Sequence, residues 1–118
     1  MTYVWVFVGG GLGSLCRYGF GQWLNKGGTY PWGTLVANGL ACIILGVLVG
    51  WVSKNNLSTE ARLLLMTGFC GGFSTFSTFS NELVQMLRHA DYFSAFSYLM
   101  LSLVFGLLAI WLGLRMVS

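Results

Sequence analysis

The stretch 71–80 reads Gly-Gly-Phe-Ser-Thr-Phe-Ser-Thr-Phe-Ser and combines hydroxyl groups, phenyl rings and a glycine pair without any charged side chain. Its Ser-Thr-Phe repeat has a period of three, so in a helix Phe76 and Phe79 share one face beside stripes of hydroxyl groups. Hydroxyl groups donate hydrogen bonds, and the edge of a phenyl ring is electropositive. Such surfaces suit a small anion that must replace its water shell inside a protein. The alternative is that the rings pack in lipid and the hydroxyl groups bond to their own backbone.

The same stretch lies between two apolar runs, and the nearest basic residues are Arg62 and Arg88. A helix joining these arginines is about 39 Å long, enough to cross a bilayer, with Thr75 at its midpoint. Unless it is only a packing contact, the pair Gly71-Gly72 predicts a break in this helix near the midplane. Backbone groups freed there must be satisfied by protein, water or an ion, and such carbonyls are a recurring cation site in transporters.

Polar residues in the other apolar segments are spaced so that they share helix faces. Thr34 and Asn38 are four residues apart, and so are Tyr98 and Ser102, with Gly106 next on the same stripe. An amide or hydroxyl group inside a membrane needs a partner. Each pair therefore predicts either a contact between helices or part of a ligand site.

Arg17 is the charged residue that lies deepest in an apolar segment. It is about two turns from the end of its helix, so it either reaches the interface or forms a fixed positive charge that attracts anions at a vestibule. Glu82, just beyond the stretch 71–80, opposes that attraction unless it is paired or protonated. An enzyme is not expected, because His89 has no evident serine partner and no pair of carboxylates lies within the membrane.

The composition of the 118 residues places the chain in a membrane. Hydrophobic residues make up 56% and charged residues only 8%, against about 25% in soluble domains, so polar groups cannot cover a globular surface. The net charge of +3 arises from basic residues spread along the chain, which form no patch for nucleic acid. Cys16, Cys42 and Cys70 lie in separate apolar segments without metal-ligand spacing, so we interpret them as small packing residues.

Apolar segments at about 3–24, 32–52, 60–87 and 93–114 are each long enough to span a bilayer. The sequence therefore predicts a single all-α integral membrane domain over residues 1–118. It has four transmembrane helices, of which the third is broken near the midplane. Short connections make consecutive helices antiparallel neighbours.

The six Lys and Arg residues divide evenly between the two sides of the predicted membrane domain if the Arg17 side chain reaches the side of Lys26 and Arg88, because Lys54, Arg62 and Arg115 are on the other side. The positive-inside rule then gives no preferred orientation. Such a chain can insert both ways, and two opposite copies can pair as an antiparallel dimer. The alternative is a small protein that some other factor orients.

The stretch 71–80 closely resembles the signature of the Fluc (CrcB-type) bacterial fluoride channels, and the resemblance covers essentially the whole chain. Matching residues in the other segments are 13–17, 33–38, Tyr98 and Ser102. The resemblance implies an antiparallel, dual-topology homodimer with two pores in the bacterial plasma (inner) membrane. It also implies passive fluoride export that lowers cytoplasmic fluoride. Gly106 is a departure, since some members continue the polar stripe there with a serine.

The resemblance implies roles for individual residues along the ion pathway. The ring edges of Phe76 and Phe79 line the fluoride path, and Asn38 is a donor in the pore. Hydroxyl groups form a polar track at Ser77, Thr78, Tyr98 and Ser102. We add Thr34 to this pathway because it shares a helix face with Asn38.

The same resemblance places Arg17 near the vestibule, where we also expect Glu82. It implies a structural sodium ion, Na⁺, at the dimer centre, held by backbone carbonyls that match Gly71 and Ser74. Besides lipid, the expected partners are fluoride and an oppositely oriented copy of the chain.

Two other functions remain for a small four-helix membrane protein. A small dual-topology multidrug exporter uses a membrane-embedded carboxylate in its first helix, whereas this chain has Arg17 and no Asp or Glu there. A non-transporting membrane scaffold is the third hypothesis, and it would move no ion in pure liposomes. We therefore expect a fluoride-selective channel.

Overall fold

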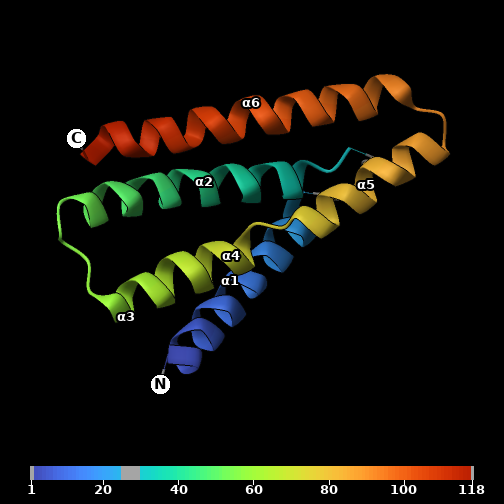
Figure 1. Ribbon diagram of the computed structural model, residues 1–118. Helices are drawn as coiled ribbons and strands as arrows, with labels where there is room; N and C mark the ends of the chain where they lie inside the picture. Colours follow the sequence, from blue (N-terminus) through green and yellow to red (C-terminus); the bar gives the residue numbers. More distant parts are fainter. Residues whose placement is uncertain (1, 25–29, 118) are drawn as a thin grey trace.

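The computed structural model describes residues 2–24 and 30–117, and this part of the chain is helical without any strand. Its helices are α1 (Thr2–Leu24), α2 (Trp32–Ser53), α3 (Thr59–Ala61), the π-helix η1 (Arg62–Cys70), α4 (Gly71–Phe73), α5 (Phe76–Arg88) and α6 (Tyr92–Val117). The elements α3, η1, α4 and α5 follow one another as the third long segment, which is interrupted once (Figure 1). The predicted all-helical fold with four long helical segments is thus confirmed. Lys26 lies outside the described residues.

The third segment begins with a side-chain cap. The Ser58 hydroxyl accepts a hydrogen bond from the N–H of Ala61 at 3.2 Å, and Glu60 lies in the first turn, where negative charge is favourable. The next nine residues, Arg62–Cys70, form a π-helix, which is wider than an α-helix and rare at this length.

The interruption of the third segment lies after the glycine pair and not at it. Gly71 and Gly72 belong to α4, and the backbone angles of Gly71 are helical, with φ −64° and ψ −34°. The chain becomes extended at Ser74, with φ −86° and ψ 154°, and at Thr75, with φ −153° and ψ 124°. The prediction that the helix unwinds at Gly71-Gly72 is therefore wrong.

The physical reason lies in packing and in capping. A Cβ atom on Gly72 would overlap the backbone of Gly10 in α1, so this glycine is required for close helix contact. Thr75, in contrast, is a good N-cap for the new helix α5, because its side-chain oxygen accepts the N–H of Thr78 at 3.2 Å. Gly72 therefore serves packing, whereas a Cβ atom on Gly71 would meet nothing within 4 Å, and the hydroxyl residues that follow the pair restart the helix.

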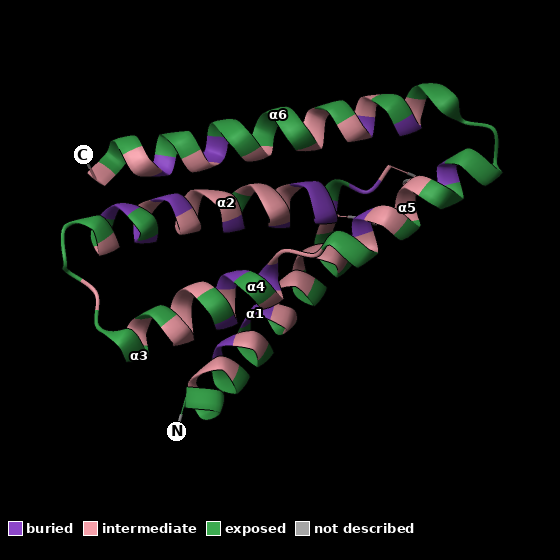
Figure 2. Ribbon diagram, in the orientation of Figure 1, coloured by how far each residue is buried: buried purple, intermediate pink, exposed green. Residues whose placement is uncertain are grey.

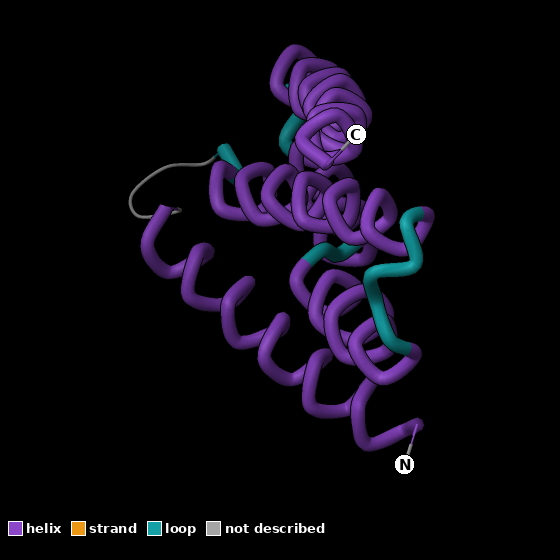
Figure 3. Tube along the Cα trace, turned by 90° about the vertical axis from the view of Figure 1, so that its left-hand side faces the viewer, coloured by secondary structure: helices purple, strands orange, loops and turns teal. Residues whose placement is uncertain are grey.

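The helix α2 lies between α6 and the third segment, and it carries more buried residues than α1 or α6 (Figures 1 and 2). Its contact with α6 is close because a Cβ atom on Gly46 would overlap the carbonyl group of Ile110, and one on Gly113 would overlap that of Ile43. The helix α1 packs against η1, α4 and α2 along one edge of the bundle, away from α6 (Figure 3).

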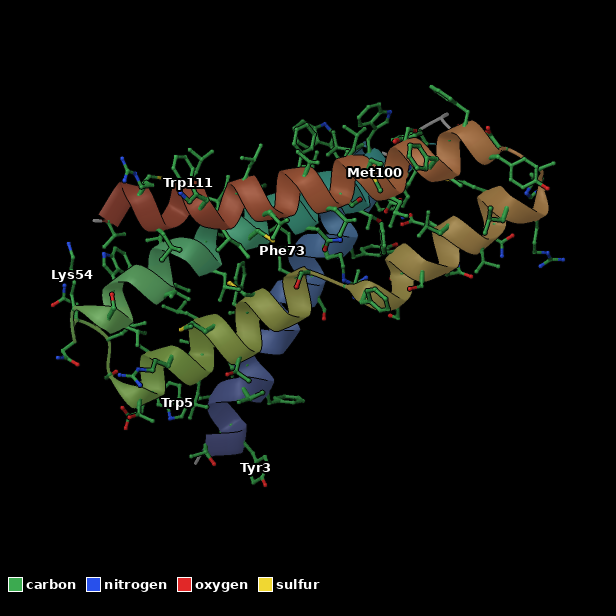
Figure 4. The ribbon with its side chains drawn as sticks, turned by 45° about the horizontal axis from the view of Figure 1, so that its top comes forward. Tyr3, Trp5, Lys54, Phe73, Met100 and Trp111 are labelled. Atoms are coloured by element: carbon green, nitrogen blue, oxygen red, sulfur yellow. The ribbon has the colours of Figure 1, made fainter. Side chains whose placement is uncertain are left out.

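Two helices of the described part, α2 and α6, are long and apolar enough to cross a membrane. Large apolar side chains cover the outer side of α6, where Met100 and Trp111 point away from the bundle (Figure 4). Phe73, in contrast, lies among the helices and is only 3% exposed. An apolar outer surface around a packed interior is typical of helices that face lipid.

Candidate functional site

Hydroxyl groups from two helices converge on the carboxylate of Glu82 in α5. The hydroxyl group of Tyr98 in α6 donates to Glu82 Oε1 at 2.8 Å, and that of Thr34 in α2 donates to Oε2 at 3.1 Å. Tyr98 is completely buried and Thr34 is 5% exposed. These two hydrogen bonds tie α2, α5 and α6 together. Each oxygen of Glu82 thus has a hydroxyl donor.

A cavity of about 380 Å³ lies beside this network, lined by Arg17, Tyr18, Gly21, Gln22, Thr34, Thr78 and Glu82. Arg17 is half-buried, and its Nε donates to the carbonyl oxygen of Gly72 at 3.2 Å. That carbonyl is at the end of α4, where the helix dipole favours a positive charge. The cavity therefore combines a fixed guanidinium group with hydroxyl groups and one hydrogen-bonded carboxylate.

Asn38 in α2 is bonded to the interruption of the third segment. Its Oδ1 accepts the N–H of Thr75 at 2.9 Å, which is the N–H that a continuous helix would give to the carbonyl of Gly71. Because the amide oxygen is held in this way, the NH₂ group of Asn38 is the end that can donate to an anion. The same side chain stabilises the interruption and presents a donor.

Phe76 and Phe79 have different surroundings although their rings are neighbours, with centroids 6.1 Å apart. Phe79 is 9% exposed, and its ring packs against that of Tyr98 at 5.0 Å. Phe76 is 80% exposed on the surface of the chain. Phe79 is thus part of the interior of one chain, whereas Phe76 projects outward.

The remaining hydroxyl groups fall into two sets. Near the interruption, Thr75 shares a hydrogen bond with Ser77 at 3.1 Å and donates to the side-chain oxygen of Thr78 at 3.3 Å. On α6, the hydroxyl group of Ser102 is buried and has no hydrogen-bond partner among the described residues. A buried polar group without a partner is costly, so Ser102 is suited to a ligand or a water molecule. It does not line the cavity beside Arg17.

Comparison with known proteins places the chain in a family. Residues 4–114 match the family described as CrcB-like protein, Camphor Resistance (CrcB). The chain belongs to this CrcB family.

Relatives of the chain carry one common name. A protein of Phocaeicola vulgatus named fluoride-specific ion channel FluC is 44% identical over 113 residues, which cover 94% of this chain and 93% of the relative. Proteins of the same name from Flavobacterium psychrophilum and Gloeothece citriformis are each 41% identical and cover 96% of this chain and 94% of theirs. The resemblance carried by the stretch 71–80 is thereby confirmed over most of the chain.

The carbonyl groups expected to hold sodium in this CrcB protein are at the interruption. The N–H of Thr75 donates to Asn38, and the N–H of Thr78 donates to the Thr75 side chain. Neither N–H therefore makes the usual helical bond, to Gly71 and to Ser74 respectively. The carbonyl groups of Gly71 and Ser74 thus fit a cation that is coordinated by backbone oxygens. The described residues contain no group of three or more His, Cys, Asp or Glu that could hold a metal ion instead.

Tyr30 is a residue beside the site of this CrcB chain that its sequence did not indicate. Its hydroxyl group shares a hydrogen bond with Ser97 at 3.2 Å, and its ring meets the edge of Tyr98 with centroids 5.7 Å apart. Tyr30 therefore braces the ring whose hydroxyl group holds Glu82. No sequence signal could have shown this contact, because a tyrosine at the start of a predicted membrane helix indicates only an interfacial anchor.

Proposed function

We propose that the chain is a fluoride-selective channel through which fluoride leaves the cytoplasm passively, and that it is not an enzyme. The observation that carries this proposal is the 44% identity, over nearly the full length of both chains, to a protein named fluoride-specific ion channel. Passive movement is in keeping with a single small helical domain of 118 residues. The multidrug-exporter alternative has no support, because α1 contains no carboxylate.

The proposed pathway begins at the cavity beside Arg17, whose positive charge draws the anion in. A fluoride ion that leaves water needs replacement donors, and the NH₂ group of Asn38 supplies one close to the interruption. The buried ring of Phe79 offers its electropositive edge, together with the outward ring of Phe76. On α6, Ser102 has an unused hydroxyl group.

The hydrogen bonds to Glu82 add a constraint on this pathway. Thr34 and Tyr98 are both proposed as fluoride donors, yet both donate to the carboxylate of Glu82. An anion therefore reaches these hydroxyl groups only by exchanging with Glu82. We infer that Glu82 sets the position of the donors and competes with fluoride for them.

The proposed assembly is an antiparallel dimer of two oppositely inserted copies in the bacterial plasma membrane. The even division of Lys and Arg supports this arrangement. Phe76 and Gly71 are both exposed on the single chain, next to the interruption, and a partner copy would cover them. Carbonyl groups of Gly71 and Ser74 would then hold a structural sodium ion. Its positive charge would interact favourably with their partly negative oxygen atoms.

The test is fluoride efflux from liposomes that contain the purified protein, measured with a fluoride electrode while valinomycin and potassium set the voltage. We expect rapid release of fluoride and no release of chloride from matched vesicles. Vesicles without protein serve as the control. If vesicles that contain folded protein release no fluoride, the channel proposal is wrong and the scaffold hypothesis takes its place.

A further inference from the structure

The helix α5 carries polar side chains on a side that the rest of the chain leaves open, and it has exposed positions along its whole length (Figure 2). Its apolar side, with Phe79, Leu83 and Met86, packs into the bundle. On another side, Asn81 and Gln85 are exposed, and neither side chain has a hydrogen-bond partner in the described ranges 2–24 and 30–117. The helix α5 is therefore amphipathic, with its polar side away from the packed core.

These two amide side chains belong to the stripe that lines the cavity of about 380 Å³. Thr78 and Glu82 of α5 both line that cavity. Asn81 and Gln85 follow Thr78 by three and seven residues, so all four side chains lie on one side of the helix. The polar surface of the cavity thus continues along α5, away from the interruption.

The depth of the amide groups limits what can surround them. Measured along the helix from Thr75 at the expected midplane, Asn81 lies about 9 Å and Gln85 about 15 Å away, whereas half of the hydrocarbon core is about 15 Å thick. An amide group without a partner is costly in lipid, so polar residues at this depth face protein or a water-filled space. The exposed polar side of α5 must therefore meet water or a second molecule.

The exposed apolar residues of α5 distinguish these alternatives. Phe76 is 80% exposed and Leu87 is 49% exposed, and Leu87 is turned from Asn81 by about 120°. This apolar side is suited to lipid or to an oppositely oriented copy of the chain. The polar side, in contrast, adjoins the cavity and leads to Arg88, which is exposed in the last turn of α5. It is the side suited to water.

We infer that Asn81 and Gln85 line a water-filled approach that leads from the membrane interface at Arg88 to the cavity beside Arg17. The NH₂ groups of the two amides can donate hydrogen bonds to an anion, and their oxygen atoms can accept them from water. An anion thus keeps donors around it until it reaches Thr78. The assignment of fluoride to this approach rests on the proposed function, whereas the access of water to α5 does not.

The test is the reaction of added cysteines with a sulfonate-bearing, membrane-impermeant thiosulfonate, present on both sides of liposomes that contain the full chain. Because a thiol reacts as its thiolate, which lipid disfavours, we expect Asn81→Cys and Gln85→Cys to react at least about tenfold faster than Leu87→Cys. Leu87 is the matched control, since it is exposed on the apolar side and lies farther from the midplane. Depth alone would therefore make Leu87→Cys react first.

Peptide masses identify the labelled residue, and wild-type protein gives the background from its three native cysteines. The variants should fold, because Asn81 and Gln85 are exposed, and their unfolding temperatures in detergent check this. Reaction of Asn81→Cys and Gln85→Cys no faster than that of Leu87→Cys would overturn the inference, because lipid or a partner copy would then cover the polar side. This comparison needs no ion flow, so a failure of the proposed function leaves it valid.

A second measurement connects the approach to ion flow. The sulfonate attached at Asn81→Cys places a negative charge in the approach, so fluoride efflux should fall by about tenfold or more. The same adduct at Leu87→Cys should leave efflux unchanged. Undiminished efflux through fully labelled Asn81→Cys would show that fluoride does not pass this side of α5, and the inferred approach would be wrong.

Discussion

The pair α2 and α6 and the broken third segment solve opposite structural problems within one small bundle. The first pair consists of continuous helices whose backbones meet at Gly46 and Gly113 without intervening side chains. The third segment contains a π-helix and an interruption at Ser74-Thr75. It is hydrogen-bonded to α2 at Thr75 and to α6 at Glu82. The difference shows that continuous helices can meet directly through glycine contacts, whereas the interrupted segment draws polar side chains from its neighbours.

The largest effect is expected from disturbing the close-packed pair. Gly46→Ala places a methyl group on the carbonyl of Ile110, and we expect it to destabilise the protein by about 3 kcal/mol, at the upper end for an overpacked core. The measurement is thermal or denaturant unfolding in detergent. Gly39→Ala, in the same helix, meets nothing within 4 Å and should be neutral or slightly stabilising. Equal stability of the two variants would show that α2 and α6 are not rigidly packed.

The next effect separates the two roles of Asn38. Asn38→Leu removes the acceptor for the N–H of Thr75, and leaving that group unsatisfied should cost about 1–3 kcal/mol and abolish flux. Asn38→Asp keeps an acceptor oxygen but loses the NH₂ donor and, when ionised, adds a charge that repels the anion. We expect Asn38→Asp to fold with near wild-type stability yet conduct little fluoride. Wild-type flux through Asn38→Asp would remove the side chain from the pathway.

A smaller effect is expected at Phe79. Phe79→Ile keeps much of the buried volume and loses the ring edge, so the protein should fold while fluoride efflux falls by up to about tenfold, the equivalent of one aromatic contact. Efflux from vesicles with equal amounts of folded protein measures this change. Phe79→Tyr, which keeps the ring, is the matched control. Undiminished efflux in Phe79→Ile would mean that the ring only packs against Tyr98.

The smallest effect is expected at Tyr30. Tyr30→Phe keeps the ring contact with Tyr98 and removes the hydrogen bond to Ser97, which should cost about 1 kcal/mol or less. Ser97→Ala breaks the same bond from α6 together with the Ser97 bond to the carbonyl of Ser94, so the double variant should be no less stable than Ser97→Ala alone. Additive losses in an unfolding experiment would contradict a direct bond between these side chains. Tyr30 would then brace Tyr98, and through it Glu82, less than the structure indicates.

Sequence and structure agree best for features that depend only on residues close together in the chain. From the sequence, Ser58 or Thr59 can cap the third segment, and the structure shows Ser58 as the cap, which depends only on residues within one turn. The interruption was expected at Gly71-Gly72 and lies at Ser74-Thr75. Whether a glycine breaks a helix or lets a neighbouring helix approach depends on what packs against it, and here Gly10 of α1 packs against Gly72. Arg17 and Glu82 were expected together at a vestibule, and Thr34 and Thr78 in the ion pathway, and only the structure places all four around one cavity.

The sequence by itself determined the membrane class, the helical segments and the stretch that identifies the family, because these follow from hydropathy, spacing and residue type along the chain. The tertiary structure decided which groups meet. It bonded Tyr98 and Thr34 to Glu82, bonded Asn38 to the backbone N–H of Thr75, and placed Arg17 and Glu82 around one cavity. The physical reason is that a hydrogen bond or a cavity depends on the separation of atoms in space. Helices distant in sequence fix that separation only when they pack.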